Sequence, residues 1–245
     1  MRSRPTSALS AGTTTQVGSI VIGSAGQAHS EPVTIDHSTL SATGGIGLSD
    51  AGPGVSMTAS HMTATQNIVA QVASLSLNAD GIAQSQWTSQ QGTIAITAPG
   101  AVQLAGSKID GVGGTSIQAG SIALTSANGN ASTVQSSGAD VTLNATGSYS
   151  QSESSVIAAG NATIHGSSVT IASAAMPATV AAVNGGVLIQ SDADLTNTGG
   201  LIQGKTRNTT QATSEGAVTL LAGGTIRATD GQARPASARS ARAAI

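Results

Sequence analysis

The chain has 245 residues, a formal net charge of −2 and no cysteine. Alanine, serine, glycine and threonine fill 137 positions, whereas charged residues make up 8% and aromatic residues 1%. Ordinary globular domains carry roughly a quarter charged residues and use aromatic rings to fill their cores, so a thin aliphatic core is expected. The composition excludes a basic nucleic-acid-binding surface and sites built from disulfides or thiolates. No apolar run reaches the length that spans a bilayer.

The N-terminal segment differs from the residues that follow it. It contains Arg2 and Arg4 but lacks the apolar stretch of a signal peptide. We therefore expect residues 1–16 to be unstructured or only partly ordered, and this chain to carry no signal peptide of its own.

A short phrase recurs along most of the sequence. It has the form apolar, any, apolar, any, alanine, any, glycine, and its clear copies begin at Leu75, Ile94, Val141 and Val218. Looser copies begin at Val33, Val55, Ile122, Val169 and Val187. Most steps between successive copies are close to 20 residues, and each of the two steps of 28 residues contains one more apolar-any-apolar triplet. The sequence is therefore a tandem repeat of short units.

The period of two within each phrase is typical of a strand that buries one face. Dense glycine and β-branched residues argue against helices. Because so short a repeat cannot bury its own apolar face, neighbouring repeats must stack. We predict an all-β fold, a parallel β-helix over residues 17–227, with roughly ten short coils about 4.8 Å apart. Val141 and Leu143 should then stack on equivalent residues of the adjacent coils.

A β-sandwich or β-barrel is the alternative all-β fold. Such folds give no reason for one phrase to recur at a regular spacing, so the solenoid is preferred. The C-terminal residues 228–245 break the repeat pattern, with Arg234, Arg239 and Arg242 set among alanine and serine. We expect this segment to be a disordered tail.

Several polar groups are candidates for chemistry. Asp36, His37 and Ser38 have the residue types of a catalytic triad, but neighbours on a strand point to opposite faces, so a polar turn is expected instead of a relay. Asp192 and Asp194 would share one strand face. Because Ca²⁺ takes six or more oxygen ligands, we expect solvated turn carboxylates there.

The remaining candidates also favour structural roles. His165 is expected on the surface, and His29 and His61 have no partner at a metal-ligand spacing. Trp87 is expected to cap or edge the solenoid instead of binding sugar. We therefore predict no catalytic, cofactor-binding or metal-binding residue and no cofactor.

One polar stretch interrupts the repeats near the C-terminus. It contains Lys205, Arg207, Asn208 and Glu215. We expect these residues to form a loop that leaves the rod. Since binding functions concentrate in loops, this is the predicted contact site.

The run Leu195-Thr-Asn-Thr-Gly-Gly-Leu-Ile202 resembles the repeats of filamentous haemagglutinin-like exoproteins, which bacterial two-partner systems secrete. The similarity covers roughly residues 185–226. It implies a right-handed parallel β-helix, export through an outer-membrane transporter, and adhesion to glycans or proteins on host or bacterial cells. No secretion or toxin domain is recognisable, so we expect an internal fragment of a larger secreted or outer-membrane-surface protein.

Two functions therefore remain in view. The first is a non-catalytic adhesive rod segment, and the second is a carbohydrate-active parallel β-helix enzyme, since the fold alone does not decide activity. An enzyme of that class needs paired carboxylates, and only Asp192 and Asp194 lie within two residues of each other. The adhesive rod is preferred. Because an internal fragment exposes strand edges, end-to-end self-association is expected, whereas nucleic acid is not an expected partner.

Overall fold

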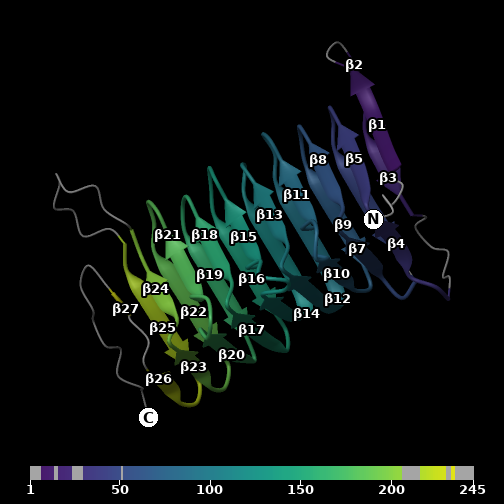
Figure 1. Ribbon diagram of the computed structural model, residues 1–245. Coiled ribbons are helices and arrows are strands. Elements are labelled where there is room, and N and C mark those ends of the chain that lie inside the picture. The colour runs from purple at the N-terminus through teal and green to yellow at the C-terminus, as the bar shows by residue number, and fades with distance from the viewer. Residues whose placement is uncertain are drawn as a thin grey trace.

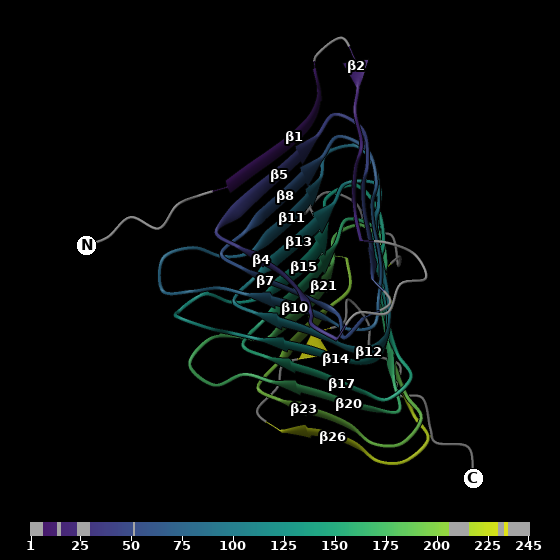
Figure 2. The same ribbon diagram turned by 90° about the vertical axis from the view of Figure 1, so that its right-hand side faces the viewer.

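The computed structural model describes residues 7–13, 16–23, 30–50, 52–205, 216–229 and 233–234. They form short strands and no helix, and the chain winds repeatedly around one axis (Figure 1). Viewed nearer to that axis, the coils have a triangular outline with three flat faces (Figure 2). The strands of each face pair in parallel with those of the next coil, which confirms the predicted parallel β-helix.

The first face contains ten parallel strands among the described residues. Its strands are β1 (Ser7–Thr13), β5 (Ser38–Ala42), β8 (His61–Ala64), β11 (Gln86–Ser89), β13 (Lys108–Gly111), β15 (Thr133–Ser136), β18 (Ser155–Ala158), β21 (Thr179–Ala182), β24 (Leu201–Gln203) and β27 (Ala233–Arg234). The short β2 (Gln16–Val17) pairs antiparallel with β1. The stack thus begins before residue 17, because β1 pairs with β5 over five residues.

The second and third faces join where β12 (Ile94–Ala105) and β14 (Thr115–Thr125) cross the corner between them. The other strands of the second face are β3 (Ile20–Ile22), β6 (Ile46–Asp50), β9 (Ile68–Val72), β16 (Val141–Ala145), β19 (Ala162–Gly166), β22 (Val187–Ser191) and β25 (Val218–Ala222). The other strands of the third face are β4 (Val33–Asp36), β7 (Val55–Thr58), β10 (Leu75–Asn78), β17 (Ser148–Ser152), β20 (Ser168–Ala172), β23 (Leu195–Thr198) and β26 (Ile226–Thr229).

Inward side chains form aliphatic ladders along the axis. Val141 stacks between Thr115 and Ala162, and Leu143 stacks between Ile117 and Ile164. This stacking was predicted, and it is confirmed. Because each inward residue contacts its equivalent one strand spacing away, branched aliphatic side chains fill most of the narrow core.

Trp87 lies in the core, contrary to the prediction that it caps or edges the solenoid. It is fully buried on β11, between Met62 and Ile109 of the neighbouring coils. Its indole Nε1–H donates to the Sδ atom of Met57 at 3.0 Å. The small inward residue Ser89 beside it leaves room for the ring.

The corner between the third and first faces is built on buried serines. Ser60 donates from its hydroxyl to the carbonyl of Thr58, and it accepts from the backbone N–H of Ser38 on the preceding coil. Ser85 and Ser132 donate in the same way, to the carbonyls of Asn78 and Thr125. The carbonyls of Thr58, Asn78 and Thr125 also accept backbone N–H groups from the neighbouring coils. The serine hydroxyls add a second hydrogen bond to each carbonyl, so the buried hydroxyls are themselves satisfied.

The coil length alternates in much of the rod. Ser38 and Ser60 occupy equivalent positions 22 residues apart, and Ser60 and Ser85 are 25 residues apart. The alternation arises at the corner between the third and first faces. From β10 onward, coils with a long loop at this corner alternate with coils that turn there in two residues. These longer loops define the most prominent irregular feature of the described surface.

Candidate functional site

The predicted contact loop lies mostly outside the described residues. Arg207, Asn208 and Glu215 fall among residues 206–215, which the structure does not describe. Lys205 follows β24, and its backbone N–H donates to the carbonyl of Gly185 at 3.0 Å. A Cβ atom on Gly204 would lie 2.2 Å from the carbonyl oxygen of Gly216. The two described residues that flank this stretch therefore lie close together at the corner between the first and second faces.

A second set of loops was not predicted. Residues 79–85, 126–132 and 173–178 project from the same corner on alternate coils, and we call them the loop ridge. Tight corners lie between them, and several of these hold a residue with positive φ, such as Ala59 at 49° and Gly106 at 64°. The ridge runs parallel to the rod axis, so it offers repeated groups at an interval of about 10 Å, two strand spacings.

His37 fastens the first loop of the ridge. Its Nδ1 atom lies 2.8 Å from Oδ1 of Asp36, and its Nε2 atom lies 2.7 Å from Oδ2 of Asp80. The second contact joins residues 43 positions apart. The hydrogen bonds to Asp80 and then Asp36 raise the pKa of His37, whereas backbone N–H donors of Ala83 and Ile82 lower the pKa of Asp80 to about 2. When it is protonated, the imidazole can donate to both carboxylates and bridge them.

Two other side chains fasten the remaining loops. The amide Nδ2 of Asn128 donates to the carbonyl of Ala79 at 3.2 Å, which joins the first loop of the ridge to the second. The carboxylate of Glu153 accepts from the Ser126 hydroxyl and from the backbone N–H of Ala175. These donors, the hydroxyl first, lower the pKa of Glu153. Each polar group is thus engaged in holding a loop against the rod.

The arrangement of Asp36, His37 and Ser38 is not a catalytic relay. The hydroxyl of Ser38 donates to the backbone carbonyl of Asp36 at 2.7 Å, not to the imidazole. The expected polar turn is present. However, the argument from a strand does not apply to His37, because this residue lies in the turn and not on a strand. His37 has a φ of 46° between β4 and β5, and this left-handed conformation turns its ring toward Asp36 instead of to the opposite face. No local sequence pattern points to Asp80, because it contacts His37 across two coils.

Asp192 and Asp194 have separate partners. Oδ1 of Asp192 lies 3.0 Å from Nε2 of His165. Nδ1 of the same histidine lies 2.9 Å from Oδ1 of Asn144. Oδ1 of Asp194 accepts the backbone N–H of Thr225 at 2.8 Å. Among the described residues, no group of three or more His, Cys, Asp or Glu side chains lies in an arrangement that would hold a metal ion.

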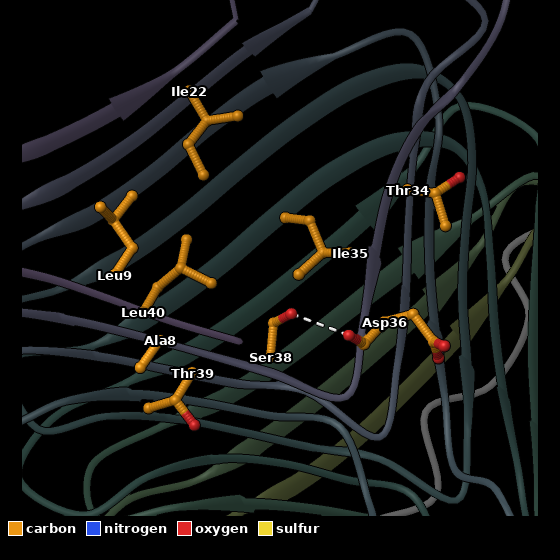
Figure 3. Close-up of a pocket in the computed structure, with 9 residues that line it drawn as sticks. All are labelled: Ala8, Leu9, Ile22, Thr34, Ile35, Asp36, Ser38, Thr39 and Leu40. Carbon is orange, nitrogen blue, oxygen red and sulfur yellow. Dashed lines mark hydrogen bonds between the residues drawn. The ribbon is translucent and has the colours of Figure 1, made fainter. Parts of the chain in front are cut away.

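The N-terminal end of the rod contains an open apolar cavity of about 350 Å³. Leu9, Ile22, Ile35 and Leu40 point into it from all three faces, whereas Thr34 points away (Figure 3). The cavity lies beside β1, β3 and β4, the first described parallel strands of the three faces. A second hollow of about 410 Å³ lies at the corner between β6, β9 and β12 and includes Asp50, whose Oδ1 accepts the backbone N–H of Gly52.

Neither cavity concentrates reactive groups. The N-terminal cavity has a single carboxylate, Asp36, on its rim, and that carboxylate contacts His37. Within the described part of the chain, no helix has the length and apolarity needed to cross a membrane.

Comparisons with known proteins do not add to this picture. The chain matches no family model, no curated protein and no solved structure. Its function must therefore be argued from the rod, its surfaces and the local resemblance of residues 185–226.

Proposed function

We propose that the chain is a non-catalytic rod segment of a secreted bacterial surface exoprotein of the filamentous haemagglutinin type, and that it contributes to cell attachment. The observation that carries this proposal is the arrangement of polar side chains in rows along flat faces. On the first face, Ser41, Thr63, Thr88, Asp110 and Gln135 occupy equivalent outward positions on successive coils.

Such a surface suits many weak contacts. Hydroxyl and amide groups repeated at one strand spacing offer hydrogen bonds to glycans or to polar protein surfaces. Each contact is weak, but rods displayed in many copies bind with an avidity that can exceed the single affinity by 10²–10⁴. The adhesive role itself is supported by the resemblance of residues 185–226, and the rod geometry supports the spacer role.

Export and location follow from the same resemblance. We propose that the larger protein passes through an outer-membrane transporter and remains secreted or attached at the bacterial surface. The partners would be glycans or proteins of host or bacterial cells. The contact loop that begins after Lys205, with Arg207, Asn208 and Glu215, is the first segment to test.

The test compares binding of multivalent and single copies to cells and to glycan arrays. We expect beads that display the chain to bind, and a variant with residues 206–215 replaced by two glycines to bind at least tenfold less. The ends of this insertion already meet at Gly204 and Gly216, so the rod should persist. The matched control replaces Ser126–Ser132 with Gly-Ser, the tight corner of residues 106–107, and should bind as the parent does.

The same preparations should be incubated with acidic polysaccharides to test the carbohydrate-active alternative. We expect no products. Turnover that disappears in the Asp192→Ala, Asp194→Ala variant would overturn the proposal in favour of an enzyme. Binding that is unchanged by removal of 206–215 would move the contact site from the loop to the faces.

A further inference from the structure

The chain contains two Asn-Gly pairs, Asn128-Gly129 and Asn184-Gly185. In such a pair the side-chain amide can react with the backbone nitrogen of the glycine, because glycine has no Cβ atom that hinders the approach. The reaction closes a ring, so it requires the backbone of both residues to rotate. The structure places the two pairs in different surroundings, and these surroundings decide whether that rotation is possible.

The first pair forms the tip of the second loop of the loop ridge. Asn128 and Gly129 have φ of 54° and 77°, and the flanking Ala127 and Asn130 exchange two backbone hydrogen bonds of 2.9 Å. This is the two-residue turn in which both central residues have positive φ. Both residues are exposed, and a Cβ atom on Gly129 would meet no atom within 4 Å. The tip can therefore open locally without displacing any other part of the rod.

The second pair lies in a tight corner between the first and second faces. The backbone N–H of Asn184 donates to the carbonyl of Ala159 on the preceding coil at 2.9 Å. The carbonyl of Gly185 accepts the backbone N–H of Lys205 on the following coil at 3.0 Å. A Cβ atom on Gly185 would lie only 2.5 Å from Oδ1 of Asn161. This pair is thus held between two coils, and rotation of its backbone would break the stack.

We propose that Asn128 is a site of spontaneous deamidation in the folded chain and that Asn184 is protected from it. The backbone nitrogen of Gly129 attacks Cγ of Asn128, and a bond between these two atoms forms as the bond from Cγ to Nδ2 breaks. Nδ2 leaves as ammonia and takes up the proton of the Gly129 amide. Water then opens the resulting succinimide ring at either of its two C–N bonds, which yields aspartate or isoaspartate.

The modification changes a contact that holds the loop ridge together. Nδ2 of Asn128 donates to the carbonyl of Ala79 at 3.2 Å, at the start of the first loop. Either product carries a carboxylate in place of the amide, so it has no N–H to donate, and its negative charge faces a carbonyl oxygen. Deamidation therefore releases the first loop from the second, whereas the contact of His37 with Asp80 remains. This inference does not depend on the proposed attachment role.

Mass spectrometry of the 245-residue chain, incubated at mildly alkaline pH and then digested, tests the selectivity. We expect Asn128 to acquire the mass increase of an amide-to-acid conversion at least ten times faster than Asn184. The rate should rise with pH, because the attacking nitrogen must lose its proton. Isomerisation of aspartate leaves the mass unchanged and does not interfere. Equal rates at the two sites, faster reaction at Asn184, or no reaction at Asn128 would overturn the proposal.

The same incubation in urea separates the effect of the fold from that of the local sequence. Once the chain is unfolded, both pairs are free to rotate, so most of the difference in rate should disappear. A difference that persists undiminished in urea would arise from the neighbouring residues and would contradict the structural explanation. Gly129→Ala should slow the reaction at Asn128 at least tenfold, because the added Cβ atom crowds the attacking nitrogen. Circular dichroism verifies that this variant keeps its β-structure.

Hydrogen exchange measures the effect on the ridge. Asn128→Asp represents one product, and the amides of residues 79–85 should exchange roughly fivefold faster in it, the factor for one ordinary hydrogen bond. Asn130→Asp is the matched control, because it adds the same charge to the same loop, but the Nδ2 of Asn130 donates within that loop, to the carbonyl of Asn128. This control should leave the exchange of residues 79–85 unchanged. Unchanged exchange in Asn128→Asp, or equal acceleration in both variants, would contradict the fastening role of the Asn128 amide.

Discussion

Trp87 is the single tryptophan of the chain, and its environment is a sensitive test of the core at the residue scale. The ring is fully buried, and its Nε1–H contacts Met57. Replacement of Trp87 by alanine should lower the free energy of unfolding by about 3–5 kcal/mol, because a large cavity forms in a narrow core. Urea denaturation measures the change. Ile157→Ala, on the outward side of β18, is the control and should cost much less.

The same residue shows where sequence patterns lose information. The first face carries one large inward residue per strand, followed by a small one, as with Met62 and Ala64 or Trp87 and Ser89. Because the second inward residue is small, these strands lack the pair of large aliphatic residues that marks the repeat phrase, and they could not be recognised from it. A lone tryptophan between polar residues suggests an edge, and only the stacked neighbours above and below it reveal a core position.

His37 gives a pH dependence that can be measured. Its pKa is raised in the folded chain by Asp80 and Asp36, so the protonated form is the one that stabilises the fold. This stabilisation is complete below the unfolded value of about 6.5 and is lost as the pH rises through the higher folded pKa. We expect the urea midpoint to fall as the pH rises above the unfolded value.

His37→Gln should flatten that part of the profile. Asp80, the partner of His37, adds a second change in stability at acidic pH. Since the pKa of Asp80 is lowered to about 2, its contribution is complete above the ordinary aspartate pKa and is lost as the pH falls toward 2. A profile of the parent chain without either transition would show that this bridge does not form in solution.

At the scale of single elements, the tight corners differ in how well their residues suit the backbone. Ala59 and Gly106 occupy equivalent corners with φ of 49° and 64°. The left-handed conformation costs an L-residue roughly 1–2 kcal/mol. Ala59→Gly should therefore stabilise the chain by about 0.5–1 kcal/mol, after the entropy cost of glycine in the unfolded state.

The reciprocal change should have the opposite sign. Gly106→Ala would place a Cβ atom 2.7 Å from the carbonyl oxygen of Ala127, and it should destabilise by at least 1–2 kcal/mol. Thermal unfolding would then shift by roughly 2–4 °C per kcal/mol for a chain of this size. If both variants changed stability in the same direction, the corner conformation described for one of them would be wrong.

Most strands of two faces could be predicted from the sequence, but the length of a coil could not. The repeat phrase located strands of the second and third faces, and the alternation of apolar residues gave their inward sides correctly. It did not give the coil length, because successive phrases such as those at Leu75 and Ile94 lie on different faces. The regular spacing of Ser38, Ser60 and Ser85 follows the true coil, but serine is so common in this chain that the signal is hidden.

The loop ridge was missed for a related reason. Residues 79–85 and 126–132 are polar stretches that resemble ordinary turns, and their shared position appears only after the coils are stacked. His37 and Asp80 are 43 positions apart, and they come into contact only because the coils stack in this register. Local patterns predict strands and bends well, whereas contacts between loops depend on the register of the whole rod.

At the scale of the whole molecule, the fold consists of one continuous stack of coils. The chain has no native cysteine, so pairs of cysteines can be introduced and spin-labelled without further changes. Ser41 and Ala181 occupy equivalent outward positions on the first face, six coils apart in the observed pairing. Thr63 is one coil closer to Ala181. The backbone of Ser41 should therefore lie about 29 Å from that of Ala181, and the backbone of Thr63 about 24 Å from it.

Pulsed electron spin resonance on these two labelled pairs is the most direct test of the rod on which the proposed attachment function rests. We expect two narrow distance distributions whose means differ by one strand spacing, about 4.8 Å, whatever the length of the label. Broad distributions, or two means that do not differ by this amount, would contradict the continuous parallel stack.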